Sequence, residues 1–371
     1  MISPSFFCDQ LKSIGVGFYS GVPDSLLKNL CAYITDTVPP KDNIIAVNEG
    51  CAVGMASGYH IATGKIPVVY MQNSGLGNAT NPLLSLADED VYNIPMVLII
   101  GWRGEPGVHD EPQHVKQGKV TCELLETMGI PYVVLSDEEE GCREQIAVCR
   151  EHLTKKGSPF AFVVRKNTFS EYKLPPVDDG NVMSREQAIE IIADSMGDSL
   201  FVSTTGMASR ELYEIRERKG QGHGSDFLTV GCMGHASQIA LGIALNTDRK
   251  VVCIDGDGAV LMHMGGMATI AVQKPGNYIH IMINNGVHDS VGGQPTVSRD
   301  IDVIGIARSV GYRKVLSVSD EKGLRDALSQ KEGPLFIEVM VHRGARADLG
   351  RPKTTPVENK ESLMRTIGAC R

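Results

Sequence analysis

Short apolar runs alternate along the chain with longer stretches in which apolar residues recur every three or four positions. The runs are rich in β-branched residues and have the length of buried strands. In the first half they read NIIAVN, PVVYMQ, PMVLIIGW, YVVLS and FAFVVRK. The stretches between them have the periodicity of amphipathic helices. This alternation predicts an α/β fold, with a mostly parallel sheet covered by helices.

The same alternation resumes in the second half of the chain. We expect helices at SREQAIEIIADSM, SRELYEIRER and HASQIALGIAL, and strands at LFVSTTG, DFLTVG, KVVCIDG and YIHIMIN. A crossover helix over residues 262–273, then one closing helix and one strand ending at PLFIEVMV, complete the expected pattern. The second half is therefore predicted to form another parallel sheet covered by helices.

Residues 167–182 separate the two halves. This segment contains two prolines and several acidic residues and has no hydrophobic periodicity, as expected for a linker. A chain of 371 residues is long enough for two domains of ordinary size. We therefore expect one domain over residues 1–166 and a second over residues 183–371.

Composition and charge exclude several classes of protein. The net charge of −8 disfavours a nucleic-acid binder, whose surface is usually basic. No apolar run approaches the ~20 residues that cross a bilayer, and the N-terminal residues do not resemble a secretory leader. The nine cysteines include no C-x-x-C pair, which argues against structural zinc and disulfides. We expect a cytoplasmic protein with reduced cysteines.

Two polar motifs follow neighbouring strands of the second half. Gly256-Asp257-Gly258 ends one strand, and Asn284-Asn285 ends the next. Each motif alone is common as a turn or a helix cap. Because the carboxyl ends of adjacent parallel strands form the ligand crevice, the two motifs are expected to converge. Their hard oxygen atoms suit Mg²⁺, and the glycines allow the backbone to approach a diphosphate.

The order of these two motifs resembles the signature of thiamine-diphosphate (ThDP) enzymes. The resemblance implies that Asp257, Asn285 and the carbonyl of Val287 bind Mg²⁺, and that Gly256, Gly258 and Ala259 contact the cofactor. It further implies a Glu that contacts the aminopyrimidine ring. Glu49, which opens a helix rich in small residues in AVNEGCAVGMASGYHIATG, matches that position.

A third segment, VGCMGHASQIALGIAL, fits the same resemblance. There, Gly231 would accept a hydrogen bond from the cofactor through its carbonyl, and Met233 would hold the bent conformation of the cofactor. A Met in such a place is also common as a simple core residue.

The chain has no room for the third, central domain of most ThDP enzymes. Its layout resembles the family of phosphonopyruvate decarboxylases and the related sulfopyruvate decarboxylases. Matching stretches include YSGVPDSLLK, GWRGEPGVHDEPQHVKQG, NNGVHDSVGGQPT and ADLGRPKTTP. The resemblance implies ThDP- and Mg²⁺-dependent decarboxylation of 3-phosphonopyruvate to phosphonoacetaldehyde and CO₂, in phosphonate biosynthesis. The sequence departs from the family pattern at His109, where a Lys is expected.

The resemblance also indicates candidate catalytic residues and candidate substrate contacts. Asp24, Ser25 and Asp289 are expected to act beside Glu49 in catalysis. Because the substrate is an anionic 2-oxo acid, candidate substrate contacts are mostly cationic or amide side chains: Asn73, Arg103, His114, Lys116, His288, Arg343 and Arg346.

Other functions remain open at the level of sequence. A sulfopyruvate decarboxylase, or another ThDP-dependent decarboxylase or carboligase, would share every cofactor residue. A Rossmann dehydrogenase would need a full G-x-G-x-x-G motif, of which only fragments are present. A non-catalytic relative would not need both Glu49 and Asp257. The family further implies a homodimer or a larger homo-oligomer whose active sites lie between chains.

Overall fold

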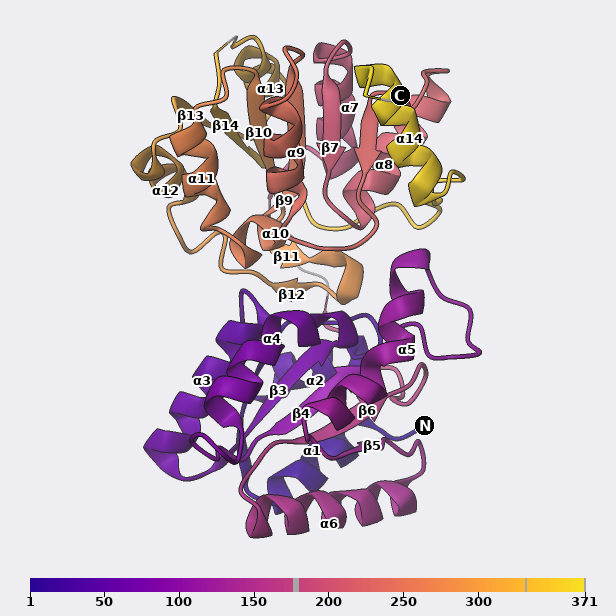
Figure 1. Cartoon of the computed structure of the whole chain (residues 1–371), viewed down its shortest axis with the longest axis vertical. Coiled ribbons are helices and arrows are strands. Elements are labelled where there is room, and N and C mark those ends of the chain that lie inside the picture. The colour runs from indigo at the N-terminus through magenta and orange to yellow at the C-terminus, as the bar shows by residue number, and fades with distance from the viewer. Residues whose placement is uncertain (176–179, 331, 370–371) are drawn as a thin grey trace. The chain divides into compact units, whose positions relative to one another are not determined.

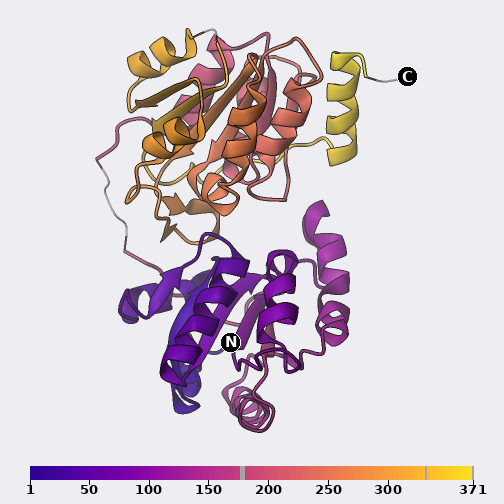
Figure 2. The same ribbon diagram turned by 60° about the vertical axis from the view of Figure 1, so that its left-hand side comes forward.

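The chain folds into two compact units. The computed structural model describes residues 1–175, 180–330 and 332–369. The first unit comprises Met1–Pro176 and Ser290–Gln294, and the second comprises Val177–Asp289 and Pro295–Arg371. Residues 176–179 of the expected linker lie outside the described residues. Each unit is a sheet with helices on both faces (Figures 1 and 2).

Unit 1 is built on a six-stranded sheet in the order β2-β1-β3-β4-β6-β5. Every recorded pairing in it is parallel. The strands are β1 Val16–Gly21, β2 Asn43–Ile45, β3 Ile66–Gln72, β4 Val97–Gly101, β5 Tyr132–Val134 and β6 Phe160–Val164. The helices are α1 Pro4–Ser13, α2 Lys28–Thr37, α3 Glu49–Thr63, α4 Leu76–Pro82, α5 Pro112–Thr127 and α6 Glu139–Lys155.

Alternating strand residues divide the core of unit 1 into two layers. On one face, α1, α2 and α6 pack against residues such as Val68 and Phe162. On the other face, α3, α4 and α5 pack against residues such as Val69 and Val163. Since both faces are covered, the strands are apolar along their whole length, as the sequence pattern predicted.

Unit 2 contains a second six-stranded sheet, in the order β13-β14-β10-β9-β7-β8. Its strands also pair in parallel. They are β7 Leu200–Ser203, β8 Asp226–Leu228, β9 Val251–Gly256, β10 Tyr278–Asn284, β13 Lys314–Val318 and β14 Leu335–Met340, and a two-stranded sheet holds β11 Val287–His288 and β12 Gln294–Pro295. The helices are α7 Arg185–Ser195, α8 Met207–Arg218, α9 Ala236–Ala244, α10 Asp257–Met262, α11 Gly266–Gln273, α12 Val303–Val310, α13 Glu321–Leu328 and α14 Pro356–Ile367.

The two units repeat one topology. In each large sheet, the strands taken in chain order lie side by side as second, first, third, fourth, sixth and fifth. The helices follow the same plan, because α7, α8 and α13 cover one face of unit 2, and α9 to α12 cover the other. Helix α14 has no counterpart in unit 1. A loop that follows a given strand in one unit therefore has an equivalent loop in the other unit. Functional residues in the two units can be compared loop by loop.

Two expectations about the elements of unit 2 are wrong. The crossover helix expected over 262–273 begins only at Gly266, as α11, because His263, which ends the short helix α10, leaves the helical conformation before the Gly265-Gly266 pair. The closing part contains two helices and two strands in place of one of each, since α12 and β13 precede α13 and β14. Helix α14 follows them.

None of the helices in the described part of the chain is both long enough and apolar enough to span a bilayer.

Candidate active site

The carboxyl ends of four adjacent strands in unit 1 carry the expected site residues. Asp24 follows β1, Glu49 follows β2, Asn73 follows β3 and Arg103 follows β4. Because these strands are neighbours in a parallel sheet, their carboxyl ends share one edge, where ligands bind in open α/β sheets.

Glu49 is a buried carboxylate at the start of α3. Asn48 caps this helix by accepting a hydrogen bond from the N–H of Cys51 at 2.8 Å, which fixes the first turn. The carboxylate accepts a hydrogen bond from Asn78 Nδ2 at 2.8 Å, and its side chain passes close to Gly75. Only 5% of Glu49 is exposed, so its carboxylate is held in place by protein.

Arg103 lies at the centre of a polar cluster. Its guanidinium makes a two-point contact with Asp110 and donates to the hydroxyl of Ser25 at 2.8 Å. Asn73 donates to the carbonyl of Arg103 and to Thr121 Oγ1, each at 2.8 Å. The structure thus brings together three of the expected residues, Ser25, Asn73 and Arg103, and adds Asp110 as the counter-charge.

Asp24 is fully buried beside this cluster. Its Oδ2 accepts from the N–H of Leu26 at 2.8 Å, while its Oδ1 has no hydrogen-bond partner among the described residues. Burial raises the pKa of Asp24, although the Leu26 N–H and the charge of Arg103 oppose this. A side chain at Gly101 would lie 2.2 Å from Asp24 Oδ2, so Asp24 would have to shift to admit one.

The other two candidates of unit 1 lie on α5. Burial lowers the pKa of His114 to about 4, so its ring is neutral at neutral pH and offers hydrogen bonds in place of a charge. Lys116 is exposed. Arg103 is therefore the candidate that combines a permanent charge with a defined position.

The carboxyl edge of unit 2 carries the second group of residues. Asp257 opens α10 directly after β9, Asn285 follows β10, and Gly231 and Met233 lie beyond β8. By the repeated topology, the loop that holds Gly231 is the equivalent of the loop that holds Glu49.

Asp257 is a buried carboxylate that accepts hydrogen bonds from two hydroxyl groups. Thr296 and Ser298 both donate to its Oδ2. Burial raises the pKa of Asp257, and these bonds lower it. Ser298 also lies 2.8 Å from Asn284 Oδ1, so its hydroxyl connects the ends of β9 and β10. Gly256, Gly258 and Ala259 form the backbone of this turn, and a side chain at Gly258 would lie 2.8 Å from the ring of His288.

Asn285 lies beside Asp257 in this sheet edge, because β9 and β10 pair directly. Its Nδ2 donates to Asp289 at 2.7 Å, and its Oδ1 accepts from the N–H of Val287 at 3.1 Å. Asp289 also accepts from Arg185 Nη1 at 2.9 Å and from the N–H of Gly344. The structure therefore gives Asp289, expected as a catalytic group, several fixed donors.

The loop after β8 has an unusual backbone. Cys232, between Gly231 and Met233, has a φ of 58°, and Gly234 has a φ of 86°. A side chain at Gly234 would lie 2.6 Å from the ring of His263, so only glycine fits. Met233 is half-buried, and its carbonyl lies 3.2 Å from His235 Nδ1.

The remaining candidates of unit 2 differ in character. Burial lowers the pKa of His288 to about 4, so it is neutral at neutral pH. Arg343 is half-buried. Arg346 pairs with the carboxylates of Glu186, Glu214 and Asp348.

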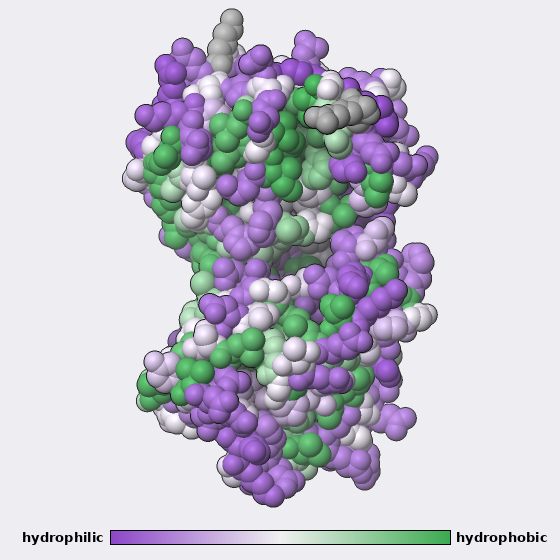
Figure 3. Space-filling view, in the orientation of Figure 1, coloured by the Kyte–Doolittle hydropathy of each residue, from purple (hydrophilic) through white to green (hydrophobic). Residues whose placement is uncertain are grey.

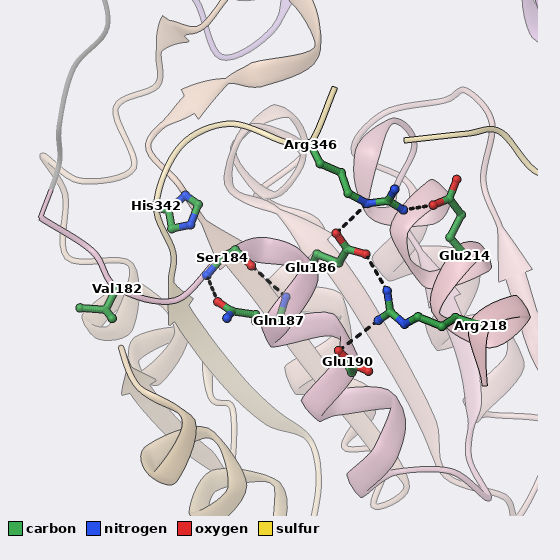
Figure 4. A pocket seen from close by; sticks show the side chains of 9 residues that line it. All are labelled: Val182, Ser184, Glu186, Gln187, Glu190, Glu214, Arg218, His342 and Arg346. Carbon is green, nitrogen blue, oxygen red and sulfur yellow. Dashed lines mark hydrogen bonds and ion pairs between the residues drawn. The ribbon is translucent and has the colours of Figure 1, made fainter. Parts of the chain in front are cut away.

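These pairs line a surface pocket of about 710 Å³ in unit 2 (Figure 4). Its walls carry a network in which Arg218 contacts Glu186 and Glu190, next to the pairs of Arg346. The residues that line the pocket are Val182, Ser184, Glu186, Gln187, Glu190, Glu214, Arg218, His342 and Arg346. Of these, Arg346 is a candidate substrate contact from the sequence. Its charge is largely compensated there.

The residues of unit 2 fit a hydrated divalent cation and a diphosphate. Asp257 contributes a buried carboxylate, Asn285 an amide oxygen and Val287 a backbone carbonyl, which are the hard ligands that Mg²⁺ prefers. The turn at Gly256 has open space where a side chain would stand, since the nearest atom to a Cβ there is 3.9 Å away. In unit 1, the buried carboxylate of Glu49 is suited to a hydrogen bond with a nitrogen atom of the cofactor's aminopyrimidine ring.

Sequence reasoning assigned no role to four residues that hold these groups. Gly75 makes room for Glu49, Asp110 pairs with Arg103, and Thr296 and Ser298 bind Asp257. Thr296 is the last residue of NNGVHDSVGGQPT and Ser298 follows two positions later, but no local pattern connects them with Asp257. Such contacts arise only when distant segments pack together.

Two family models match this chain. The family model "Thiamine pyrophosphate enzyme, N-terminal TPP binding domain" matches residues 5–128, and "Thiamine pyrophosphate enzyme, C-terminal TPP binding domain" matches residues 204–339. A phosphonopyruvate decarboxylase of Streptomyces viridochromogenes is 35% identical, covering 96% of this chain and 93% of that protein.

Two further relatives are similar over most of their length. A phosphonopyruvate decarboxylase of Streptomyces hygroscopicus is 36% identical, covering 96% of this chain and 92% of that protein. A sulfopyruvate decarboxylase of Methanosarcina acetivorans is 28% identical, covering 85% of this chain and 84% of that protein. The chain thus belongs to the phosphonopyruvate decarboxylase family of thiamine-diphosphate enzymes: it is a ThDP-dependent decarboxylase with two ThDP-binding-fold units.

Proposed function

We propose that the chain decarboxylates 3-phosphonopyruvate to phosphonoacetaldehyde and CO₂, as a step of phosphonate biosynthesis. In this reaction the bond between the carbonyl carbon and the carboxylate breaks, CO₂ leaves, and a proton takes its place. The observation that carries the proposal is the identity of 35% and 36% to two phosphonopyruvate decarboxylases along 96% of the chain.

The cofactor is held by residues of both units. Asp257, Oδ1 of Asn285 and the carbonyl of Val287 would hold Mg²⁺, and the Gly256–Gly258 turn would receive the diphosphate. Bound ThDP supplies the electron sink that accepts the electron pair released with CO₂. Glu49 would hydrogen-bond to the aminopyrimidine ring, and the hydrogen bond that it accepts from Asn78 fixes the direction of its carboxylate. Gly231 and Met233 support the ring from the loop after β8.

The polar cluster around Arg103 is the proposed site for the phosphonate. Asp110 already orients the guanidinium of Arg103, which also donates to Ser25. Binding of the phosphonate would therefore not have to order this side chain. Compensation by Asp110 moderates the positive charge, which limits stabilisation of the carboxylate that must leave. His114, neutral by its lowered pKa, would donate a hydrogen bond and add no second charge.

We further propose that the active form is a homodimer or a larger homo-oligomer. Each unit has an apolar helical surface that supports this. Helix α3 exposes Gly54, Gly58 and Ile61, the last at 73%, and the end of α9 leads to Leu245 at 50%. Apolar residues are visible over both helices in Figure 3. In such an assembly, Glu49 of one protomer would serve the same cofactor as Asp257 of its partner, and the site would be complete only between chains.

Sulfopyruvate is the second candidate substrate. The identity of 28% to a sulfopyruvate decarboxylase favours it less, but every proposed cofactor residue is compatible with both reactions. The two substrates differ mainly in the charge of the anionic group, which the cluster around Arg103 would meet.

A substrate panel tests the proposal. The purified protein, supplied with ThDP and MgCl₂, should release CO₂ and an aldehyde from 3-phosphonopyruvate with a higher kcat/KM than from sulfopyruvate, pyruvate or benzoylformate. Release of CO₂ from none of these acids, or a highest kcat/KM for another acid, would overturn the proposed substrate.

A further inference from the structure

A chain of buried polar contacts in unit 2 ends on the amide of Asn285. Asn285 Nδ2 donates to Asp289 Oδ2 at 2.7 Å, and Arg185 Nη1 donates to the same oxygen at 2.9 Å. Arg185 makes a two-point contact with Glu211, at 2.8 and 3.0 Å. The four side chains come from α7, α8 and the segment that follows β10.

These contacts are shielded from water. The side chains of Arg185 and Glu211 are 8% and 2% exposed, and that of Asp289 is 12% exposed. Arg185 is the first residue of α7, whose start is fixed by a capping box between Ser184 and Gln187. The guanidinium therefore reaches Asp289 from a rigid element.

The charge of Asp289 determines how the amide of Asn285 is turned. A carboxylate only accepts hydrogen bonds, so the Nδ2 of Asn285 must face Asp289 and the Oδ1 must face the opposite direction. That direction holds the N–H of Val287, at 3.1 Å from Oδ1. A flipped amide would place two oxygen atoms against each other and leave a buried N–H of Val287 without its partner.

Arg185, itself fixed by Glu211, in turn holds Asp289 in place. Arg185 lies between the two carboxylates, and the N–H of Gly344 adds a donor to Asp289 at 3.0 Å. Three donors thus converge on Asp289, which fixes its carboxylate beside Asn285.

We infer that Arg185, Glu211 and Asp289 are positioning residues that present the Oδ1 of Asn285 to the divalent cation. This inference rests on the proposed Mg²⁺ site and assigns Asp289 a role different from direct catalysis. Partners that orient a metal ligand typically change metal affinity by about 10–100-fold when they are removed.

Binding of Mg²⁺ to the apo-protein, measured by calorimetry in the presence of ThDP, tests the inference independently of turnover. Asp289→Asn removes the charge and keeps the shape, and Arg185→Lys removes the two-point contact and keeps the charge. Each variant should raise the Kd for Mg²⁺ by about 10-fold or more.

Arg216→Lys is the matched control. Arg216 forms another buried two-point pair in unit 2, with Asp226, at 3.1 Å for each contact, and this pair does not reach Asn285. Both Arg→Lys changes should lower the melting temperature, but only Arg185→Lys should weaken Mg²⁺ binding. Equal Kd values for Arg185→Lys, Asp289→Asn and Arg216→Lys would overturn the inference.

A charge exchange gives a second readout. Asn285→Asp combined with Asp289→Asn restores a carboxylate beside an amide, with the amide now donating to residue 285, and should recover most of the affinity lost in Asp289→Asn. Asp257→Ala distinguishes a failure of the proposed metal site from a failure of the positioning inference. If Asp257→Ala leaves Mg²⁺ binding unchanged, the proposed metal site fails; if it abolishes binding while the Asp289 and Arg185 variants bind normally, only the positioning inference fails.

Discussion

Gly75 lies directly against the side chain of Glu49. A Cβ at position 75 would be 2.4 Å from Glu49 Oε1 and 2.7 Å from its Cγ. Gly75 closes a short turn, Asn73–Gly75, that follows β3, whereas Glu49 opens α3. The absence of a side chain at Gly75 is therefore what allows the carboxylate its observed position.

Gly75→Ala should consequently displace the carboxylate of Glu49 at little cost in stability, because the clashing atoms belong to a flexible side chain. We expect a loss of kcat of at least about 10-fold, in line with the effect of misplacing an acid–base group. Gly77→Ala, where a Cβ has no atom within 4 Å, is the control and should retain full activity. Normal turnover by Gly75→Ala would show that the position of Glu49 is not critical.

Arg103 is expected to govern substrate affinity. Its loss in Arg103→Gln removes a charge-assisted contact worth about 1.5–3 kcal/mol, so the KM for 3-phosphonopyruvate should rise by about 10–100-fold, with a smaller change in kcat. Arg165→Gln alters an exposed guanidinium that pairs with Glu105 and should leave KM unchanged. Steady-state kinetics distinguish the two variants, and an equal KM in both would remove Arg103 from the phosphonate site.

His114 should make the fold sensitive to mild acid. Burial lowers its pKa from 6.5 to about 4, so below pH 6.5 the unfolded chain binds a proton that the folded chain does not. Stability is then lost as the pH falls from 6.5 towards about 4, at about 1.4 kcal/mol per pH unit for one such group. Urea unfolding at several pH values should show a shallower loss for His114→Gln than for the natural chain. Identical slopes would contradict a neutral, buried His114.

Subunit mixing tests whether two chains share each active site. Inactive Glu49→Gln and inactive Asp257→Ala subunits, once exchanged, would form mixed dimers with one doubly altered site and one intact site. An equimolar, fully exchanged mixture should recover about a quarter of the natural activity, because about half of the dimers are mixed. If mass spectrometry shows complete exchange and activity does not return, each site is made within one chain.

Much of the fold follows from local patterns, and the exceptions have physical causes. Strands β9 and β10 are continuous apolar runs because both faces of the sheet are covered, so they are evident from sequence. Strand β13 was missed because it is an edge strand whose residues are partly exposed, which weakens its pattern. Helix α14 could have been found, since Thr355 and Glu358 form a capping box around Pro356.

The candidate site was accessible from sequence only where its residues lie in motifs. Asp257 and Asn285 stand at strand ends with flanking glycines or amides, and Glu49 stands in a helix start rich in small residues. The contacts of Glu49 with Gly75, and of Arg103 with Asp110, join separate segments of the chain. No periodicity encodes such pairs, because they depend on how the loops after β3 and β4 fold.

A competition experiment tests the proposed preference of this ThDP-dependent decarboxylase for 3-phosphonopyruvate. With ThDP and MgCl₂ present, equal concentrations of 3-phosphonopyruvate and sulfopyruvate are mixed with the protein, and the two aldehyde products are followed by NMR. The ratio of initial rates equals the ratio of kcat/KM values. We predict a ratio of at least about 10 in favour of 3-phosphonopyruvate, which corresponds to ~1.4 kcal/mol of discrimination. A ratio near one, or one in favour of sulfopyruvate, would contradict the proposed substrate preference.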